Sequence, residues 1–384
     1  MKKNSPQVYL IRYGELFLKS DFVFRQFEKK LKANISWLLN KKGIKHYFET
    51  ERGRIFLFPE KDPTQELKKV FGIVSFSPTF CLPTTKLSEI KKFCQKTFKG
   101  FVKKKETFAI RVKKVGTLPY SSLKLAKEIG RVVEGKVNLE NPKKEIFIEV
   151  RGNKTYIFTK IFPGLGGLPV SSSGKVISFL SGGIDSPVSS FLAMKRGCQV
   201  VFLHFHSFPL VSKKSIEKCQ KIVKILSDYQ PKNKLILVPF QKIQTHLKTK
   251  ASAKYLIVLY RRSMLRVGQK IAKKENAKAI FTGESLAQVS SQTLANLATI
   301  EEAVKIPILR PLIGMDKQEI VDLAKKIGTY EVSILPQEDC CQLFVPKHPA
   351  TQARVEIIKK IEKKLNLKNL EKEILKEKEE ILIE

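Results

Sequence analysis

The first 77 residues alternate between two spacings of apolar side chains, one typical of strands and one typical of helices. Strand-like runs occupy residues 8–14, 54–58 and 73–80, and helix-like runs occupy residues 21–43 and 63–72. Gly43 ends the longer helix-like run and Pro63 begins the shorter one, as is common at helix ends and starts. This alternation suits a βαββαβ domain of the split-βαβ type over residues 1–77, which has one strand more than the three strand-like runs.

Strand-like and helix-like runs also alternate over residues 78–163, which we predict to be a second domain. We expect the boundary between the two domains between residues 55 and 80. The helix-like runs are residues 87–100 and 121–136, and the strand-like runs are residues 107–114 and two within 145–162. The sequence RGNK at residues 151–154 is a turn signal between the last two strands. Gly, Pro and Ser accumulate over residues 164–174, which predicts a linker.

Residues 175–384 contain strand-like runs that are predominantly apolar and are separated by helical stretches. These runs are residues 176–180, 199–205, 234–240 and 278–283. Such runs are typical of strands buried on both faces, so the alternation predicts a doubly wound parallel sheet. The mixed-charge segment from Ala353 onward is predicted to be helical. The predicted fold class is thus α/β for this part, preceded by two α+β domains.

The composition favours a polyanionic partner. The chain has 384 residues, of which 42% are hydrophobic, and 72 Lys and Arg outnumber 36 Asp and Glu to give a net charge of +36. This charge indicates a nucleic acid rather than a membrane, because no basic amphipathic helix with exposed aromatic residues stands out. A generally lysine-rich composition is the alternative. The start lacks an apolar signal-peptide core and no run could span a bilayer, so we expect a cytoplasmic protein.

The six cysteines are too few for a disulfide scaffold, and no two of them form a CxxC pair. We therefore predict reduced thiols and no metal site of the zinc or iron–sulfur type. Cys340 and Cys341 lie side by side among polar residues, which suits a reactive thiol. The other four are expected in the core: Cys81, Cys94, Cys198 and Cys219.

Residues 181–186, SGGIDS, follow the first apolar run of the third domain directly. In a doubly wound sheet, ligands bind beyond the carboxyl ends of the strands. Gly182 and Gly183 allow a tight turn that presents backbone N–H groups to an anion, and the start of the next helix also favours phosphate. We expect Ser186 to cap that helix and Pro187 to lie in its first turn.

This loop carries Asp185 where a Walker-type loop carries a lysine. Without the lysine, the loop is better suited to chemistry at the α-phosphate, with pyrophosphate as the leaving group. Asp185 can hold a Mg²⁺ ion that screens the phosphates. The pattern SGGxDS is the PP-loop of ATP pyrophosphatases, which activate a carbonyl oxygen as an adenylate. An ordinary strand-to-helix turn is the alternative.

Several further motifs extend this match along the chain. They are IRYGELFLKS, GLGGLPVSSSGK, SGGIDSPV, LHFHSFP, LYRRSMLR, TGESLAQVSSQTL and EDCCQLFVPKHPAT. With them the chain resembles the tRNA 4-thiouridine synthetases (tRNA uracil 4-sulfurtransferases) over nearly its whole length. The resemblance implies a ferredoxin-like domain, a THUMP RNA-binding domain and a PP-loop domain at residues 175–384. The chain resembles the short form without a rhodanese domain, which leaves open any role in thiamine biosynthesis.

The resemblance also implies an ATP site at the PP-loop and the neighbouring strand ends. The implied contacts are Phe179, Leu180, Ser181, Gly182, Gly183, Asp185, Ser186, His204, Phe205, Arg261, Gly283 and Gln292. His204 and Phe205 would contact the base and Arg261 a phosphate, whereas His204 alone would more often be a packed core histidine.

The implied reaction is adenylation of O4 of uridine-8 in tRNA, followed by transfer of sulfur to C4 to give 4-thiouridine. A persulfide on Cys340 would deliver the sulfur and displace AMP. Cys341 or an external thiol would resolve the intermediate, and a cysteine desulfurase would be the sulfur donor. The family also suggests a homodimer.

Basic residues of the first two domains would hold the acceptor end of the tRNA through its phosphates. The candidates are Lys103, Lys104, Lys105, Arg111, Lys113 and Lys114. Two other functions stay open: a PP-loop ligase with a small-molecule substrate, and an RNA-binding module whose catalytic domain is inactive. The cysteine pair and the basic N-terminal half argue against the first, and the intact PP-loop argues against the second.

Overall fold

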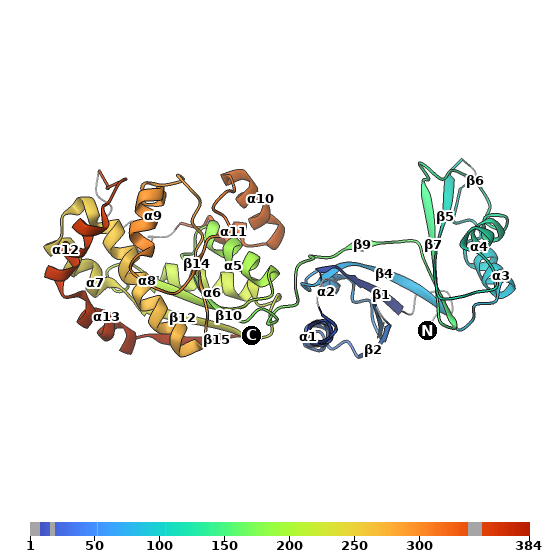
Figure 1. Ribbon diagram of the computed structural model, residues 1–384, viewed down its shortest axis with the longest axis horizontal. Coiled ribbons are helices and arrows are strands. Elements are labelled where there is room, and N and C mark those ends of the chain that lie inside the picture. Colours follow the sequence, from blue (N-terminus) through green and yellow to red (C-terminus); the bar gives the residue numbers. More distant parts are fainter. Residues whose placement is uncertain (1–7, 16–19, 52, 104, 337–347) are drawn as a thin grey trace. The chain divides into compact units, whose positions relative to one another are not determined.

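The computed structural model describes residues 8–15, 20–51, 53–103, 105–336 and 348–384. The chain divides into a first compact unit, Met1–Glu28 with Ile35–Gly167, and a second unit, Lys29–Asn34 with Leu168–Glu384. Each unit has its own sheet and its own core (Figure 1). None of the described helices is both long enough and apolar enough to cross a membrane.

The strands of the first unit form a sheet in the order β2-β3-β1-β4-β8-β7-β5-β6, with β9 paired to β4. The strands are β1 (Val8–Tyr13), β2 (His46–Glu51), β3 (Arg54–Pro59), β4 (Ile73–Leu82), β5 (Thr107–Val115), β6 (Lys136–Val137), β7 (Lys144–Arg151), β8 (Lys154–Phe158) and β9 (Phe162–Pro163). The helices are α1 (Asp21–Lys41), α2 (Thr64–Leu67), α3 (Leu87–Thr97) and α4 (Ser122–Gly130). The order β1-α1-β2-β3-α2-β4 confirms the predicted βαββαβ arrangement.

The long strand β4 connects the two halves of this sheet. Residues 73–79 of β4 pair with β1, and residues 80–82 pair with β8. The predicted boundary at residue 77 therefore falls inside one continuous strand, and the position of the boundary stays a prediction.

The segment predicted as a linker, residues 164–174, begins against β4. The N–H groups of Gly164 and Gly166 donate to the carbonyl oxygens of Val74 at 2.9 Å and Ile73 at 2.8 Å. A Cβ atom on Gly164 would lie 2.1 Å from the Ile73 oxygen, so only glycine fits there. The start of this segment is thus fixed to the first unit, which ends at Gly167.

The strands of the second unit form a sheet in the order β14-β13-β10-β11-β12-β15, in which only the described pair β12–β15 is antiparallel. The strands are β10 (Lys175–Phe179), β11 (Gln199–His206), β12 (Asn233–Pro239), β13 (Ile280–Phe281), β14 (Ile308–Leu309) and β15 (Glu379–Ile383). The helices are α5 (Asp185–Lys195), α6 (Lys214–Leu226), α7 (Gln241–Lys250), α8 (Leu256–Glu275), α9 (Leu294–Glu301), α10 (Lys317–Ile327), α11 (Tyr330–Ser333), α12 (Val355–Leu365) and α13 (Leu367–Lys376).

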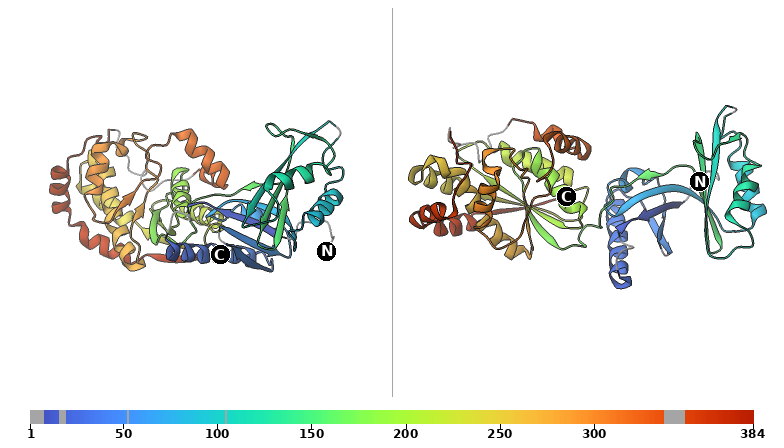
Figure 2. Two further views of the ribbon diagram at one scale, coloured as in Figure 1. Left: turned by 45° about the vertical axis from the view of Figure 1, so that its right-hand side comes forward. Right: turned by 45° about the horizontal axis from the view of Figure 1, so that its top comes forward.

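The connections make this second sheet doubly wound. From β10 the chain passes to β11 and β12 on one side, and it then crosses to β13 and β14 on the other side. Helices α5 and α6 pack on one face of the sheet, and α8 and α13 pack on the other (Figures 1 and 2). The predicted α/β class with a doubly wound parallel sheet is confirmed.

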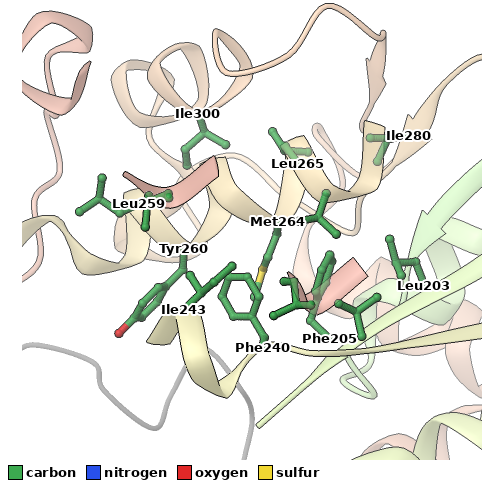
Figure 3. Close-up of a cluster of buried hydrophobic side chains, with 14 of the residues drawn as sticks. Leu203, Phe205, Phe240, Ile243, Leu259, Tyr260, Met264, Leu265, Ile280 and Ile300 are labelled. Carbon is green, nitrogen blue, oxygen red and sulfur yellow. The ribbon is translucent and has the colours of Figure 1, made fainter. Parts of the chain in front are cut away.

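Helix α8 supplies much of the apolar surface that packs on this sheet. Met264 and Leu265 of α8 lie in one buried cluster with Phe205 of β11 and with Phe240, which follows β12 (Figure 3). The rings of Phe205 and Phe240 make an edge-to-face contact, with centroids 5.4 Å apart. Because three of these residues also line the cavity described below, the same core supports the floor of that cavity.

The C-terminal segment differs from its prediction at its end. Residues from Ala353 onward form α12 and α13 as predicted, but Glu379–Ile383 form the strand β15 instead of a helix. β15 pairs with β12 at the edge of the sheet, with Ile381 opposite Leu235. The edge of β12 offers unpaired backbone groups, so tertiary pairing outweighs the local helical pattern of this charged segment.

Candidate active site

The site lies where the winding of the second sheet reverses. β10 and β13 are neighbours, and the chain leaves them in opposite directions around the sheet. The segments after the two strands line one cavity of about 600 Å³. Crevices at such switch points are the usual ligand sites of open α/β sheets.

The loop after β10 is closed by two of its own serines. The Ser181 N–H donates to Ser186 Oγ at 3.0 Å, and the two hydroxyl oxygens are 3.2 Å apart. Gly182 has φ +84°, which favours glycine. The prediction that Ser186 caps the helix is wrong: α5 begins at Asp185 after Ile184 without a side-chain cap, because the Ser186 hydroxyl folds back onto the loop. Pro187 lies in the first turn, as predicted.

The segment after β13 touches this loop through Gly283. A Cβ atom there would lie 2.9 Å from the Ser186 nitrogen and 3.0 Å from the carbonyl carbon of Asp185. A side chain at this position would therefore push the two segments apart. The glycine lets the end of β13 and the start of α5 form one continuous wall.

Asp185 has a lysine partner that comes from far along the sequence. Lys317 Nζ lies 2.6 Å from one carboxylate oxygen of Asp185, and Gln288 Nε2 donates to the other at 3.2 Å. Lys317 is the first residue of α10, whose start is fixed by a capping box between Asp316 and Glu319. The loop itself has no lysine, but the fold brings one to it.

Two arginines share the carboxylate of Glu284 beside the loop. Arg261 Nη1 bonds to Oε1 of Glu284, and Arg310 Nε lies 2.7 Å from Oε2. Thr282 Oγ1 also donates to Oε2, at 2.8 Å. Burial alone would raise the pKa of Glu284, but the two arginines outweigh it and hold that pKa below its usual value. Glu284 is therefore ionised at neutral pH.

The other part of the cavity is apolar. Phe179, Phe205, Met264 and Ile300 are among its lining residues. The rings of Phe179 and Phe205 meet edge to face, 5.4 Å apart. One end of the cavity thus suits a flat aromatic group, and the other offers charged and hydroxyl groups.

Most of the predicted nucleotide contacts line this cavity. These are Phe179, Leu180, Ser181, Gly183, Asp185, Ser186, Phe205, Arg261, Gly283 and Gln292. Gly182 and His204 are not among the described lining residues. His204 is buried behind the loop, where its Nδ1 lies 2.8 Å from the Leu180 oxygen and its Nε2 lies 3.3 Å from Ser215 Oγ. Burial lowers the pKa of His204 to about 4, so its ring is neutral.

The two cysteines proposed for sulfur chemistry, Cys340 and Cys341, lie outside the described residues. The other cysteines behave as expected of core residues. Cys94, Cys198 and Cys219 are buried and Cys81 is half-buried, all as free thiols.

Three charged residues of the site were missed from the sequence. Glu284 and Arg310 both follow a strand of the parallel sheet, and a polar side chain in that place is a usable signal. Lys317 carries no such signal, because it begins a helix 132 residues after Asp185.

The predicted RNA contacts divide between the two faces of the first sheet. Arg111 and Lys113 lie on the face opposite the core of α3 and α4, because alternate residues of β5 face opposite sides and Phe108 is in that core. Lys114 lies on the helix side and donates to the Tyr120 oxygen at 3.3 Å. Lys103 and Lys105 are exposed, and Lys104 lies outside the described residues.

Comparisons with known proteins agree along the whole chain. Residues 171–367 match the family model "Thiamine biosynthesis protein (ThiI)", residues 8–77 match the "ThiI ferredoxin-like domain" and residues 84–160 match the "THUMP domain". A probable tRNA sulfurtransferase from Halothermothrix orenii is 42% identical over 375 residues, covering 94% of each chain. One from Methanothermobacter thermautotrophicus is 40% identical, covering 96% of each.

The comparison with a solved structure agrees with these sequence matches. It is the crystal structure of a 4-thiouridine synthetase–RNA complex with bound ATP, which is 37% identical and has a TM-score of 0.89. The match covers 98% of this chain and 99% of that chain. The ferredoxin-like, THUMP and PP-loop classes expected from the sequence are thereby confirmed. The chain belongs to the tRNA sulfurtransferase family, the 4-thiouridine synthetases, and is an enzyme of that family.

Proposed function

We propose that this enzyme uses ATP to transfer sulfur to uridine-8 of tRNA, giving 4-thiouridine and releasing AMP and pyrophosphate. The observation that carries the proposal is the cavity at the switch point, in which the SGGIDS loop, Arg261 and an aromatic floor come together. A relative of the same fold is described with RNA and ATP bound. We therefore place the ATP in this cavity and take the tRNA as the second substrate of the same reaction.

The adenosine occupies the apolar end of the cavity, and the phosphates lie along residues 181–186. The start of α5 and the glycine-rich turn favour a phosphate there. Arg261 donates to a phosphate oxygen, and Lys317 is placed to exchange its partner Asp185 for the leaving pyrophosphate. Uridine O4 attacks the α-phosphorus, the bond to the β-phosphate oxygen breaks, and pyrophosphate leaves.

The residues of this site fit a Mg²⁺ ion that would be bound jointly by the protein and by the phosphates of the nucleotide. Among the described residues, no three His, Cys, Asp or Glu side chains gather in a way that could hold a metal ion. Asp185 lines the cavity, and one carboxylate together with phosphate oxygens is a common Mg²⁺ environment. Asp185 would hold the ion, which would screen phosphate charge.

The sulfur step is assigned to Cys340. Its terminal persulfide sulfur attacks C4 of the adenylated uridine, and AMP leaves with the electron pair of the C4–O4 bond. Cys341 or an external thiol then attacks the Cys340 sulfur, which forms a disulfide and frees the thiocarbonyl of 4-thiouridine. A cysteine desulfurase renews the persulfide in the cytoplasm after a reductant has opened the disulfide.

The RNA is held through its phosphates by the basic first unit. The net charge of +36 and the exposed Lys103, Lys105 and Lys113 support a contact that positions the acceptor end without reading its sequence. A homodimer is also part of the proposal and is tested by sedimentation with and without tRNA.

Reconstitution tests the function. Purified enzyme, tRNA, ATP, Mg²⁺, a cysteine desulfurase and cysteine should yield thiolated tRNA together with AMP and pyrophosphate. Cys340→Ser should abolish thiolation and leave the tRNA-dependent release of pyrophosphate at the adenylation step. Products of ADP and orthophosphate would contradict the proposal, and thiolation by Cys340→Ser would contradict the role of that cysteine. Cys341→Ser, with and without added thiol, separates the two routes of resolution.

A further inference from the structure

Glu284 is a buried carboxylate in the wall of the cavity. It is 5% exposed, and both of its oxygens accept hydrogen bonds. Oε1 accepts from Arg261, and Oε2 accepts from Arg310 Nε at 2.7 Å and from Thr282 Oγ1 at 2.8 Å. Burying a carboxylate is costly unless its charge is matched, so the two guanidinium groups and this carboxylate depend on each other.

Arg261 is the partner that faces the cavity. Its side chain is 25% exposed, and within the described part of the chain Glu284 is the side chain that bonds it. Its buried Nε has no acceptor among the described residues. A guanidinium is a rigid plane with five N–H donors, so fixing Nη1 on Glu284 sets the direction of the remaining donors.

The far side of Glu284 is fixed as well. Arg310 bonds to Glu284 through Nε and to Glu301 through Nη1, at 2.6 Å. The Thr282 hydroxyl holds the same oxygen as Arg310. Glu284 is therefore a rigid support between the frame of the sheet and the side chain of Arg261.

We propose that Glu284 is a positioning residue that directs Arg261 at the nucleotide phosphates. The inference rests on the proposed function, because it requires the cavity to bind ATP. A charged donor that is held in place before binding loses little entropy when the phosphate arrives and needs no rearrangement. Glu284 thus acts on the nucleotide through Arg261 and not by touching it.

The second unit holds a matched carboxylate that serves as the control. Glu371 is 1% exposed and pairs with Arg266 at 2.7 Å and with Lys270 at 3.4 Å. Ser263 Oγ also donates to it, at 3.1 Å. Like Glu284 it has two cations and one hydroxyl, but it is not among the described residues that line the cavity. Glu371→Gln therefore measures what losing such a group costs the fold alone.

The test is a double-mutant cycle read by ATP affinity in calorimetry and by kcat/KM for tRNA-dependent pyrophosphate release. Glu284→Gln and Arg261→Ala should each weaken ATP binding by about 10–100-fold, the range for a lost charge-assisted hydrogen bond. In the Arg261→Ala background, Glu284→Gln should add no more than about twofold. Glu371→Gln should lower the melting temperature and leave ATP affinity within about twofold of the wild type.

Two results would overturn the proposal. One is a multiplicative effect, in which Glu284→Gln costs the same factor with or without Arg261. The other is a Glu284→Gln variant that behaves as Glu371→Gln does, with lower stability and normal ATP affinity. If Glu284→Gln does not fold, Glu284→Asp takes its place in the same cycle, because it keeps the charge and withdraws the carboxylate by one methylene. Equal losses in both backgrounds would again refute the role.

ATP binding measured without tRNA separates this inference from the proposed function. A wild-type enzyme that binds ATP but releases no pyrophosphate with tRNA would refute the adenylation chemistry. The cycle on ATP affinity would still decide whether Glu284 positions Arg261. A wild-type enzyme that binds no ATP would refute both.

Discussion

Replacing Gly283 by alanine tests whether the two walls of the cavity are in direct contact. The new Cβ atom would lie 2.9 Å from the Ser186 nitrogen and 3.0 Å from Ser186 Cα. These are backbone atoms at the start of α5, so no side-chain rotation can relieve the overlap. An ordinary contact needs about 3.4 Å, so the end of β13 and the PP-loop must separate by roughly 0.5 Å.

The cost of that separation can be estimated from the known cost of overpacking. Adding a methyl group to a closely packed site typically costs about 1–3 kcal/mol. If the PP-loop moves, most of this appears as weaker nucleotide binding, and 1–2 kcal/mol corresponds to about a 5–30-fold loss of affinity. If the protein resists the movement, the same cost appears as a lower melting temperature.

Calorimetric titration with ATP, combined with thermal unfolding, distinguishes the two outcomes for Gly283→Ala. Gly314→Ala is the matched control, because it lies in the same unit and a Cβ atom there would meet nothing within 4 Å. That variant should bind ATP as the wild type does. Normal ATP affinity and normal melting temperature in Gly283→Ala would refute the close contact between the two segments.

Two further predictions concern pH and RNA. Burial lowers the pKa of His204 to about 4. The neutral ring therefore stabilises the folded state by roughly 3 kcal/mol above pH 6.5. This stabilisation is lost as the pH falls through about 4. His204→Gln should therefore flatten the decrease in unfolding free energy between pH 7 and 4 in urea titrations, and an unchanged slope would contradict a neutral buried ring. For RNA, Lys113→Gln should reduce the salt dependence of tRNA binding by about one phosphate contact, whereas its neighbour Lys114→Gln, on the helix side of β5, should not. An unchanged salt dependence for Lys113→Gln would contradict an RNA contact on the face opposite α3 and α4.

The parts of the fold that follow from local pattern were predictable from the sequence. Parallel strands buried on both faces are mostly apolar, so residues 176–180 and 199–205 stand out without any knowledge of their neighbours. The PP-loop is equally local, because its two glycines and two serines act within six residues. Order along the chain then gives the doubly wound sheet.

Features that depend on contacts between residues far apart in the sequence could not be predicted from local pattern. β15 forms because the edge of β12 is available, and nothing in the charged C-terminal segment marks that edge. The Ser186 hydroxyl had two local acceptor roles, and only the folded loop shows that it closes onto Ser181. Lys317 reaches Asp185 through the packing of α10 against α5, which no spacing rule supplies.

The charged side chains around the cavity offer a reason why the PP-loop can lack a lysine. The described ion pairs around the cavity set three cations, Arg261, Arg310 and Lys317, against three carboxylates. The carboxylates are Asp185, Glu284 and Glu301, so the formal sum is zero. Each of these cations thus has a carboxylate partner before a nucleotide arrives. On the proposed function, Arg261 keeps Glu284 when a phosphate binds, whereas the half-exposed Lys317 is placed to exchange Asp185 for a phosphate oxygen. If the proposed function holds, we expect this site to grip a triphosphate less firmly than a loop with its own lysine, and pyrophosphate to leave as Lys317 returns to Asp185.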